Sequence, residues 1–162
     1  MITIRRFTPG DEQHVQDLIV TIMNSEFKTE SAAYPVDDIR NIPTAYGKIG
    51  EGFFVAEDNS RIIGTVAVKK EDDRVALMRR LFVAPQYRNQ KIGAKLIDRA
   101  LHFCQEMGYD EVVFKATSNM SKAVEICKKK GFVARAKLQL GSVELCKLVI
   151  SLRNGHAAKS AK

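Results

Sequence analysis

The sequence predicts a single mixed α/β domain in which one sheet carries helices on both faces. The chain has 162 residues, enough for one domain with a core of its own. Short apolar runs are typical of strands, and the segments between several of them show helical spacing. One strand–helix–strand unit predicts a parallel pair, and short turns make the other neighbouring strands antiparallel.

In the first half of the chain, breaker residues separate a strand, a helix and two further strands. The sequence Thr-Pro-Gly-Asp ends the first strand, and apolar residues then recur every three or four positions. Prolines and glycines favour a loop after this helix, and a polar dipeptide between two apolar runs favours a hairpin. The expected elements are a strand at 2–7, a helix at 11–27, a loop at 28–50 with one short helix near 36–40, and strands at 52–58 and 61–70 joined by Asn59-Ser60.

In the second half, Pro85 stops a fourth strand, and a helix with one apolar face follows. Gly108 and Gly131 stand where the two helices of this half should end in left-handed caps. Ser118 or Asn119 can cap the start of the second helix. The expected elements are a strand at 74–84, a helix from Gln90 to Gly108, a strand at 111–117, a helix from about 119 to 130, and strands at 132–140 and 143–152. The resulting order is β-α-(α)-β-β-β-α-β-α-β-β.

The composition favours a globular protein of a reducing compartment. The apolar stretches are shorter than ten residues, and the N-terminus lacks the apolar core of a secretory signal. Cys104, Cys127 and Cys146 fit neither a disulfide framework nor a zinc site. We therefore expect a cytoplasmic protein without a membrane segment or a metal ion. The expected domain spans residues 1–153, followed by a flexible basic tail at 154–162.

The formal net charge of +7 allows attraction for an anionic ligand, although solubility is a simpler explanation. The basic residues are spread along the chain. No stretch interleaves them with aromatic residues as a single-strand binder would. Nucleic acid is therefore the less favoured partner.

The sequence YRNQKIGAKL places basic and amide residues and a glycine where the fourth strand gives way to a helix. The first N–H groups of a helix lack internal partners and lie at the positive end of its dipole, so they can bind a phosphate. Gly93 lets a ligand approach closely, and Arg88 and Lys91 add positive charge. Alternatively, Gly93 only permits tight helix packing while the cations are solvated. The sequence contains neither the dinucleotide-binding glycine pattern nor a P-loop.

At this point the chain resembles the GNAT superfamily of N-acetyltransferases. The segment LFVAPQYRNQKIGAKLIDRAL is similar to motif A, V-x-P-x-Y-R-x-x-G-x-G/A, although Lys91 replaces its first glycine. NMSKAVEICKKKGF, residues 119–132, resembles motif B. The resemblance covers essentially residues 2–152. It implies a GNAT-like acyl-CoA N-acyltransferase fold, in which the two parallel strands splay apart around a coenzyme A site.

The resemblance also implies where acetyl-CoA, the cosubstrate, would bind. Backbone amides after the fourth strand would hold its pyrophosphate, and that strand's last residues would pair with its pantetheine arm. The amide near Val83 would polarise the thioester carbonyl. Asn119 would contact the pantetheine arm or cap its helix. We expect a negative φ at Lys91, so that the motif glycine is dispensable there. The expected coenzyme-binding residues are Phe82, Val83, Arg88, Asn89, Gln90, Lys91, Ile92, Gly93, Ala94 and Asn119.

Two positions depart from the catalytic residues that the family commonly uses. Cys127 stands where a tyrosine acid is common, and its thiol either donates a proton or only packs as a small apolar group. Leu77 stands where a glutamate base is frequent. Glu57 is the next candidate base, with a solvated turn carboxylate as the alternative. By analogy Tyr34, Asp37 and Asp38 border the acceptor, where they either recognise a cationic amine or serve as cap and loop residues.

The resulting prediction is an N-acetyltransferase that uses acetyl-CoA. A primary amine of a small molecule or peptide would attack the thioester directly in a ternary complex. Two alternatives stay open, namely an acyl-CoA-binding or regulatory domain without enzymatic activity and a nucleic-acid binder. The family often dimerises through its C-terminal strands, so a homodimer is also open.

Overall fold

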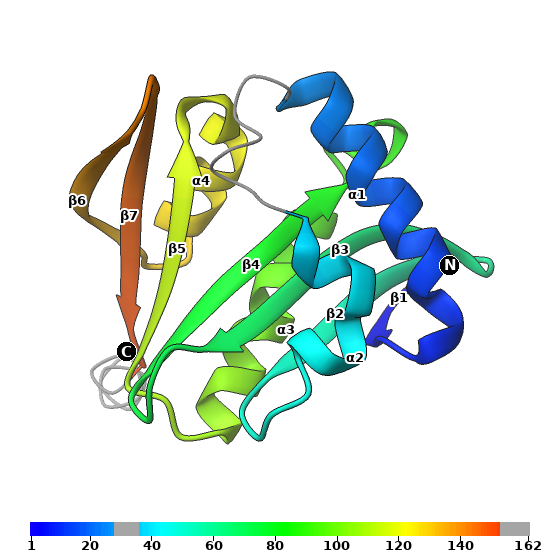
Figure 1. The fold of residues 1–162 in the computed structure, drawn as a ribbon, viewed down its shortest axis with the longest axis horizontal. Coiled ribbons are helices and arrows are strands. Elements are labelled where there is room, and N and C mark those ends of the chain that lie inside the picture. The colour runs from blue at the N-terminus through cyan, green and yellow to red at the C-terminus, as the bar shows by residue number, and fades with distance from the viewer. Residues whose placement is uncertain (28–35, 153–162) are drawn as a thin grey trace.

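The computed structural model describes residues 1–27 and 36–152, and these form one mixed sheet of seven strands (Figure 1). The strand order is β1-β2-β3-β4-β5-β7-β6. Strands β4 and β5 run parallel, and the other described pairs are antiparallel. The strands are β1 (Ile2–Arg6), β2 (Gly52–Asp58), β3 (Arg61–Lys70), β4 (Val75–Val83), β5 (Glu111–Thr117), β6 (Val133–Leu140) and β7 (Val143–Ser151). The predicted fold class is confirmed.

Helices cover both faces of the sheet, as Figure 1 shows. Helices α1 (Glu12–Glu26) and α2 (Ile42–Ala45) lie on one face, and α3 (Ile92–Glu106) and α4 (Ser121–Lys129) lie on the other. Each face has its own buried apolar cluster, because alternate strand residues point to opposite faces. The α1 cluster includes Val15, Ile19, Ile22, Phe53 and Phe82, and the α3 cluster includes Phe54, Met78, Leu96, Ile97 and Phe114.

The predicted turns and helix ends are also confirmed. Asn59 and Ser60 join β2 to β3 with φ angles of 49° and 73°. Gly108 and Gly131 follow α3 and α4 with φ angles of 83° and 112°, a region that glycine enters without a steric penalty.

The expected cap of the fourth helix is wrong. Residues Ser118–Met120 form a short 3-10 helix, and α4 begins only at Ser121. The residue before α4 is Met120, which provides no side-chain capping bond. The Asn119 side chain turns instead toward α1, where its Nδ2 donates to the Glu26 carbonyl at 3.3 Å. Ser118 and Asn119 therefore lie within the 3-10 helix, and neither is the residue that precedes α4.

Strand β4 contains a bulge at Arg80. Between the pairs Thr65–Phe82 and Ala67–Arg79, β4 has one residue more than β3. Arg80 absorbs this extra residue with a φ of 53°. At the bulge, two successive side chains point to the same face of the sheet. Beyond it, side chains again alternate between the two faces.

Two expectations concern residues outside the described ranges: Tyr34 in the loop after α1, and the flexible tail at 154–162. The short helix expected near 36–40 is present as a 3-10 helix at Asp37–Asn41, directly before α2. Within the described part of the chain, no helix has the length and apolar character needed to cross a membrane.

Candidate active site

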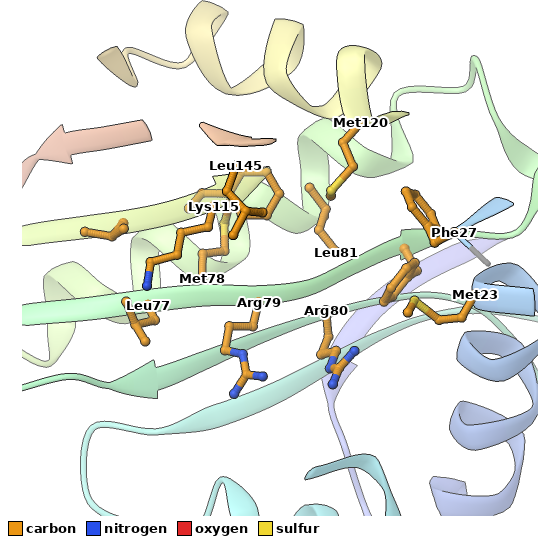
Figure 2. A pocket seen from close by; sticks show the side chains of 13 residues that line it. Met23, Phe27, Leu77, Met78, Arg79, Arg80, Leu81, Lys115, Met120 and Leu145 are labelled. Carbon is orange, nitrogen blue, oxygen red and sulfur yellow. The ribbon is translucent and has the colours of Figure 1, made fainter. Parts of the chain in front are cut away.

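A cleft opens where β4 and β5 separate. Their parallel pairing begins at Val75–Glu111 and ends at Leu77–Val113. Beyond this point the strands enclose a space of about 240 Å³, which α1 and the 3-10 helix before α4 also line (Figure 2). Most of the lining side chains are apolar, and three are cationic. The apolar side chains include Met23, Phe27, Leu77, Phe82, Met120 and Leu145, and the cations are Arg79, Arg80 and Lys115. The predicted splay of the two strands is confirmed.

The strained residue Arg80 is held by partners from distant segments. Its Nε donates to Asp38 Oδ2 at 2.9 Å, and a second guanidinium nitrogen donates to Oδ1. The Tyr46 hydroxyl donates to the same carboxylate, and the Thr65 hydroxyl donates to the Arg80 carbonyl at 2.7 Å. These contacts fix the bulge beside the cleft.

The Asp38 carboxylate stays ionised although it is largely buried. Burial by itself raises its pKa, but hydrogen bonds from Arg80 and Tyr46 outweigh this effect and hold the pKa below its usual value. Asp38 therefore serves the bulge. The sequence had suggested either amine recognition or a cap and loop role for Asp38, and its pairing with Arg80 was not foreseen.

The loop after β4 has a backbone that the sequence did not predict. Lys91, the residue before α3, has a φ of 64°, and Asn89 has a φ of 66°. The expectation of a negative φ at Lys91 is therefore wrong. The residue does not belong to the first helical turn but precedes it, in the left-handed region that favours glycine. The family's glycine at this position thus has a conformational reason, which Lys91 meets under strain.

The first turn of α3 leaves its amides available to a ligand. The side chain of Lys91 makes no capping hydrogen bond. The Arg88 amide already donates to the Pro85 carbonyl at 3.3 Å, and the Lys95 amide donates to the Lys91 carbonyl at 3.1 Å. The amides between them lie at the exposed N-terminus of a 15-residue helix, where an anion is bound most favourably.

The edge of β4 that faces the cleft offers a further donor. The Ala84 amide donates to the Ile63 carbonyl of β3 at 2.8 Å. Successive strand residues direct their backbone groups to opposite edges, so Val83 presents its own amide and carbonyl away from β3. This is the edge where the family resemblance implies an amide donor for the thioester.

Gly93 is not required by the packing of the protein itself. A Cβ built on Gly93 would lie 3.6 Å from Ile126 and 3.9 Å from Val83, which are ordinary contact distances. Tight helix packing therefore does not explain this glycine. The Cβ position faces α4 and the end of β4, and close approach of a ligand to the backbone stays as the alternative explanation.

Side chains around the loop form a network that sequence reasoning missed. The Arg88 guanidinium donates to both carboxylate oxygens of Glu26, at 2.9 and 3.0 Å, and to the Val83 carbonyl at 3.1 Å. Lys122 of α4 donates to Asn89 Oδ1 at 3.1 Å and so adds a cation beside the loop. Lys122 lies shortly after Asn119, but its hydrogen-bond partner Asn89 is more than thirty residues away in the sequence. The sequence therefore carried no signal for this contact.

The structure does not bring the two candidate catalytic residues to the cleft. Cys127 has no exposed surface and lies in the α3 cluster, where burial raises its pKa to about 12. Glu57 lies on β2 and accepts a hydrogen bond from Arg5 Nε at 3.0 Å. Neither side chain lines the cleft. Their placement favours packing for Cys127 and a paired surface carboxylate for Glu57.

Within residues 1–27 and 36–152, no group of three histidine, cysteine or acidic side chains is arranged to hold a metal ion.

The sequence profile of the acetyltransferase (GNAT) family matches residues 17–132 of the chain. Over 101 residues the chain is 32% identical to N-acetyltransferase 8 of Mus musculus, covering 59% of this chain and 44% of that protein. It is 30% identical to N-acetyltransferase 8B of Homo sapiens over the same length and the same shares. The chain thus spans about half the length of the curated relatives that it matches.

Solved structures with the same fold cover nearly the whole chain. A GNAT-family acetyltransferase from Staphylococcus aureus has a TM-score of 0.82 at 23% identity, covering 94% of this chain and 99% of that one. The Salmonella typhimurium protein yncA, solved with acetyl-CoA, has a TM-score of 0.77 at 17% identity, covering 93% and 94%. Spermidine N-acetyltransferase from Vibrio cholerae, solved with CoA and spermine, has a TM-score of 0.72 at 21% identity, covering 93% and 95%.

Proposed function

Because the chain belongs to the acetyltransferase (GNAT) family, we propose that it transfers the acetyl group of acetyl-CoA to a primary amine. One observation carries this proposal. The cleft reaches Phe82 near the end of β4, and a short loop then leads to the N-terminus of α3 with its available amides, so a donor and an acceptor could meet there. The acetyl-CoA in the related yncA structure supports the same donor.

The residues at the donor end suit a diphosphate. Amides from Asn89 to Ala94 would hold it, and the positive end of the α3 dipole would favour its charge. Lys122 lies beside the loop, and Arg88 would be available if the anion competed with Glu26 for its guanidinium. The adjoining edge of β4 at Phe82 and Val83 would pair with the pantetheine arm.

When bound, acetyl-CoA supplies an activated acetyl group. A bond forms between the amine nitrogen and the acetyl carbon, the carbon–sulfur bond breaks, and its electrons remain on sulfur. The amine loses a proton and the sulfur gains one. The Val83 amide lies on the correct edge to stabilise negative charge on the carbonyl oxygen. This is direct attack in a ternary complex, with no acetylated side chain.

Neither candidate side chain lies where it could take the proton from the amine or give one to the sulfur. Cys127 and Glu57 stay untested as acid and base, and their positions outside the cleft favour water in both roles. A Cys127→Ser variant tests this assignment, since packing predicts a loss of stability with little change in kcat. A selective loss of kcat at unchanged stability would restore Cys127 as the acid.

Two measurements test the proposed function. A melting curve should rise by several degrees with acetyl-CoA or CoA and not with NAD, because a ligand at about 100 times its Kd adds about 2.7 kcal/mol. Thiol release from acetyl-CoA should then depend on an added amine. Binding without turnover over a broad amine panel would instead identify a non-enzymatic acyl-CoA-binding domain.

The acceptor is a small molecule or a peptide amine in this proposal. The three cysteines are free thiols, which supports a reducing compartment such as the cytoplasm. A homodimer stays a proposal as well, tested by the mass of the protein in solution.

A further inference from the structure

Two cations face the cleft from equivalent positions on its two strands. The last parallel pair is Leu77 with Val113. Two residues further along each strand stand Arg79 and Lys115, on the same face of the sheet as that pair, since side chains alternate. Both line the cleft, and Figure 2 shows Lys115 reaching from β5 toward β4, from which Arg79 extends. If the strands had stayed paired, these two cations would be direct neighbours.

Neither cation has a paired carboxylate within the described part of the chain, although Arg79 lies close enough to Asp38 to help lower its pKa. Arg80 has Asp38, but Arg79 and Lys115 have no hydrogen bond or ion pair among the interactions of residues 1–27 and 36–152. The cleft lining contains no carboxylate within these ranges. The strands no longer pair at Arg79 and Lys115, and Lys115 is exposed, so a ligand can reach the cations. Two cations in a cleft without a carboxylate favour a ligand that carries negative charge.

The phosphates of the donor would not supply this charge. Arg79 precedes Val83 by four residues, or about 13 Å of strand, and the phosphate-binding loop lies beyond Val83. The two cations are therefore at the opposite end of the cleft from the loop. Their surroundings there are the apolar side chains Leu77 and Leu145.

We propose that the acceptor is an amine that also carries a carboxylate, such as an α-amino acid with an apolar side chain or a short peptide, bound through Arg79 and Lys115. This inference rests on the proposed acetyl transfer and names its substrate class. Arg79 can bind a carboxylate through two nitrogens, and Lys115 adds a point charge. The apolar lining would receive the side chain. The same two cations disfavour a polyamine, because it would bring further positive charge into the cleft.

The cations would also assist the chemistry. A positive charge nearby disfavours the protonated form of an amine and lowers its pKa. The acceptor would therefore lose its proton more readily in a cleft that offers no carboxylate base. Arg79 and Lys115 would be positioning and specificity-determining residues.

The first test compares matched acceptors: L-phenylalanine, L-phenylalaninamide, phenethylamine and spermidine. We expect kcat/KM for the amino acid to exceed that for its amide by about 10- to 100-fold, the size of a charge-assisted hydrogen bond. The amide has the more acidic ammonium group, so amine reactivity alone predicts the opposite order. Equal or greater activity with the amide, phenethylamine or spermidine would overturn the inference while leaving acetyl transfer established.

The second test removes the cations one at a time. Arg79→Gln and Lys115→Gln should each reduce the preference for the amino acid over its amide about tenfold, a ratio that a general loss of activity would not change. Lys137→Gln is the matched control, because Lys137 is exposed on β6 and away from the cleft. A CoA-dependent rise in Tm confirms that each variant is folded. An unchanged preference in both cleft variants would contradict the proposal.

The third test does not depend on turnover. Calorimetry would compare N-acetyl-L-phenylalanine with N-acetylphenethylamine as ligands of the CoA-loaded protein. A carboxylate-dependent affinity that Arg79→Gln lowers about tenfold supports the inference even if no acceptor is turned over, in which case only the proposed activity fails. Equal affinity for the two ligands, or no loss in Arg79→Gln, would overturn the inference.

Discussion

Arg80 and Lys91 share a left-handed backbone conformation, yet the protein holds them in different ways. Arg80 is 6% exposed, and its side chain is paired with Asp38 beneath the bulge of β4. Lys91 is exposed at the start of α3, and its side chain makes no capping bond. Each conformation costs about 1 to 2 kcal/mol for a residue other than glycine. Side-chain contacts thus hold the left-handed conformation of Arg80, whereas that of Lys91 belongs to the loop backbone alone.

The difference separates the two ends of the cleft. The bulge places Arg79 and Arg80 on the face that we assign to the acceptor, so its geometry depends on contacts with the Asp38 segment. The Lys91 loop places amides at the end that we assign to the donor, and its geometry depends on local backbone angles. Substitutions at the two sites should therefore have unequal effects.

The largest effect is expected when Arg80 loses its partner. Asp38→Ala should lower the free energy of unfolding by about 3 to 5 kcal/mol, because it leaves a guanidinium group buried without its counterion. Urea unfolding measures this change. Asp37→Ala is the matched control, since Asp37 is exposed, and it should stay within about 0.5 kcal/mol of the parent. Similar losses in the two variants would show that the ion pair does not hold the bulge.

The second-largest effect is expected on CoA binding when Gly93 is substituted, without a loss of stability. Gly93→Ala adds a methyl group that the protein accommodates at 3.6 Å from Ile126. If a ligand approaches this position, the Kd of CoA should rise about tenfold, as calorimetry would measure. Gly10→Ala is the control, because a Cβ there meets nothing within 4 Å. An unchanged Kd in Gly93→Ala would move the donor away from this turn.

Acid should weaken the Arg80 site and spare the Lys91 loop. The folded pKa of Asp38 is lowered, so the carboxylate stabilises the protein fully above its unfolded pKa of about 3.8, and this contribution is lost as the pH falls below that value. Between pH 7 and pH 3, the free energy of unfolding measured in urea should therefore fall less in Asp38→Asn than in the parent. If it falls equally or more in the variant, other carboxylates cause the acid sensitivity.

The smallest effect is expected at the exposed site. Lys91→Gly removes the left-handed strain but makes the unfolded chain more flexible, so the net stabilisation should lie between zero and about 1 kcal/mol. Lys95→Gly, four residues later inside α3, should instead destabilise by about 1 kcal/mol. Thermal unfolding of both variants compares the signs directly. Destabilisation by Lys91→Gly would mean that its lysine side chain contributes a contact outweighing the strain.

Local signals were sufficient for much of the architecture. Alternation, helical spacing and the glycine caps predicted the strands and the main helices, because each depends on a few neighbouring residues. The start of α4 could not be predicted this way. Asn119 has the chemistry of a cap, but it lies within the 3-10 helix Ser118–Met120, and its amide nitrogen contacts a carbonyl of α1 that is distant in sequence.

At the end that we assign to the donor, the sequence predicted the strand, the turn and the helix but not the left-handed backbone of Asn89 and Lys91. A phosphate site made from amides needs a strand, a turn and a helix in succession, all within one continuous segment. At the end that we assign to the acceptor, the arrangement depends on tertiary contacts, since Asp38 and Thr65 hold the bulge and the two cations come from different strands. Tertiary structure also removed Cys127 and Glu57 from the cleft. The physical reason is that charges act through space, whereas backbone conformation is set largely by neighbours along the chain.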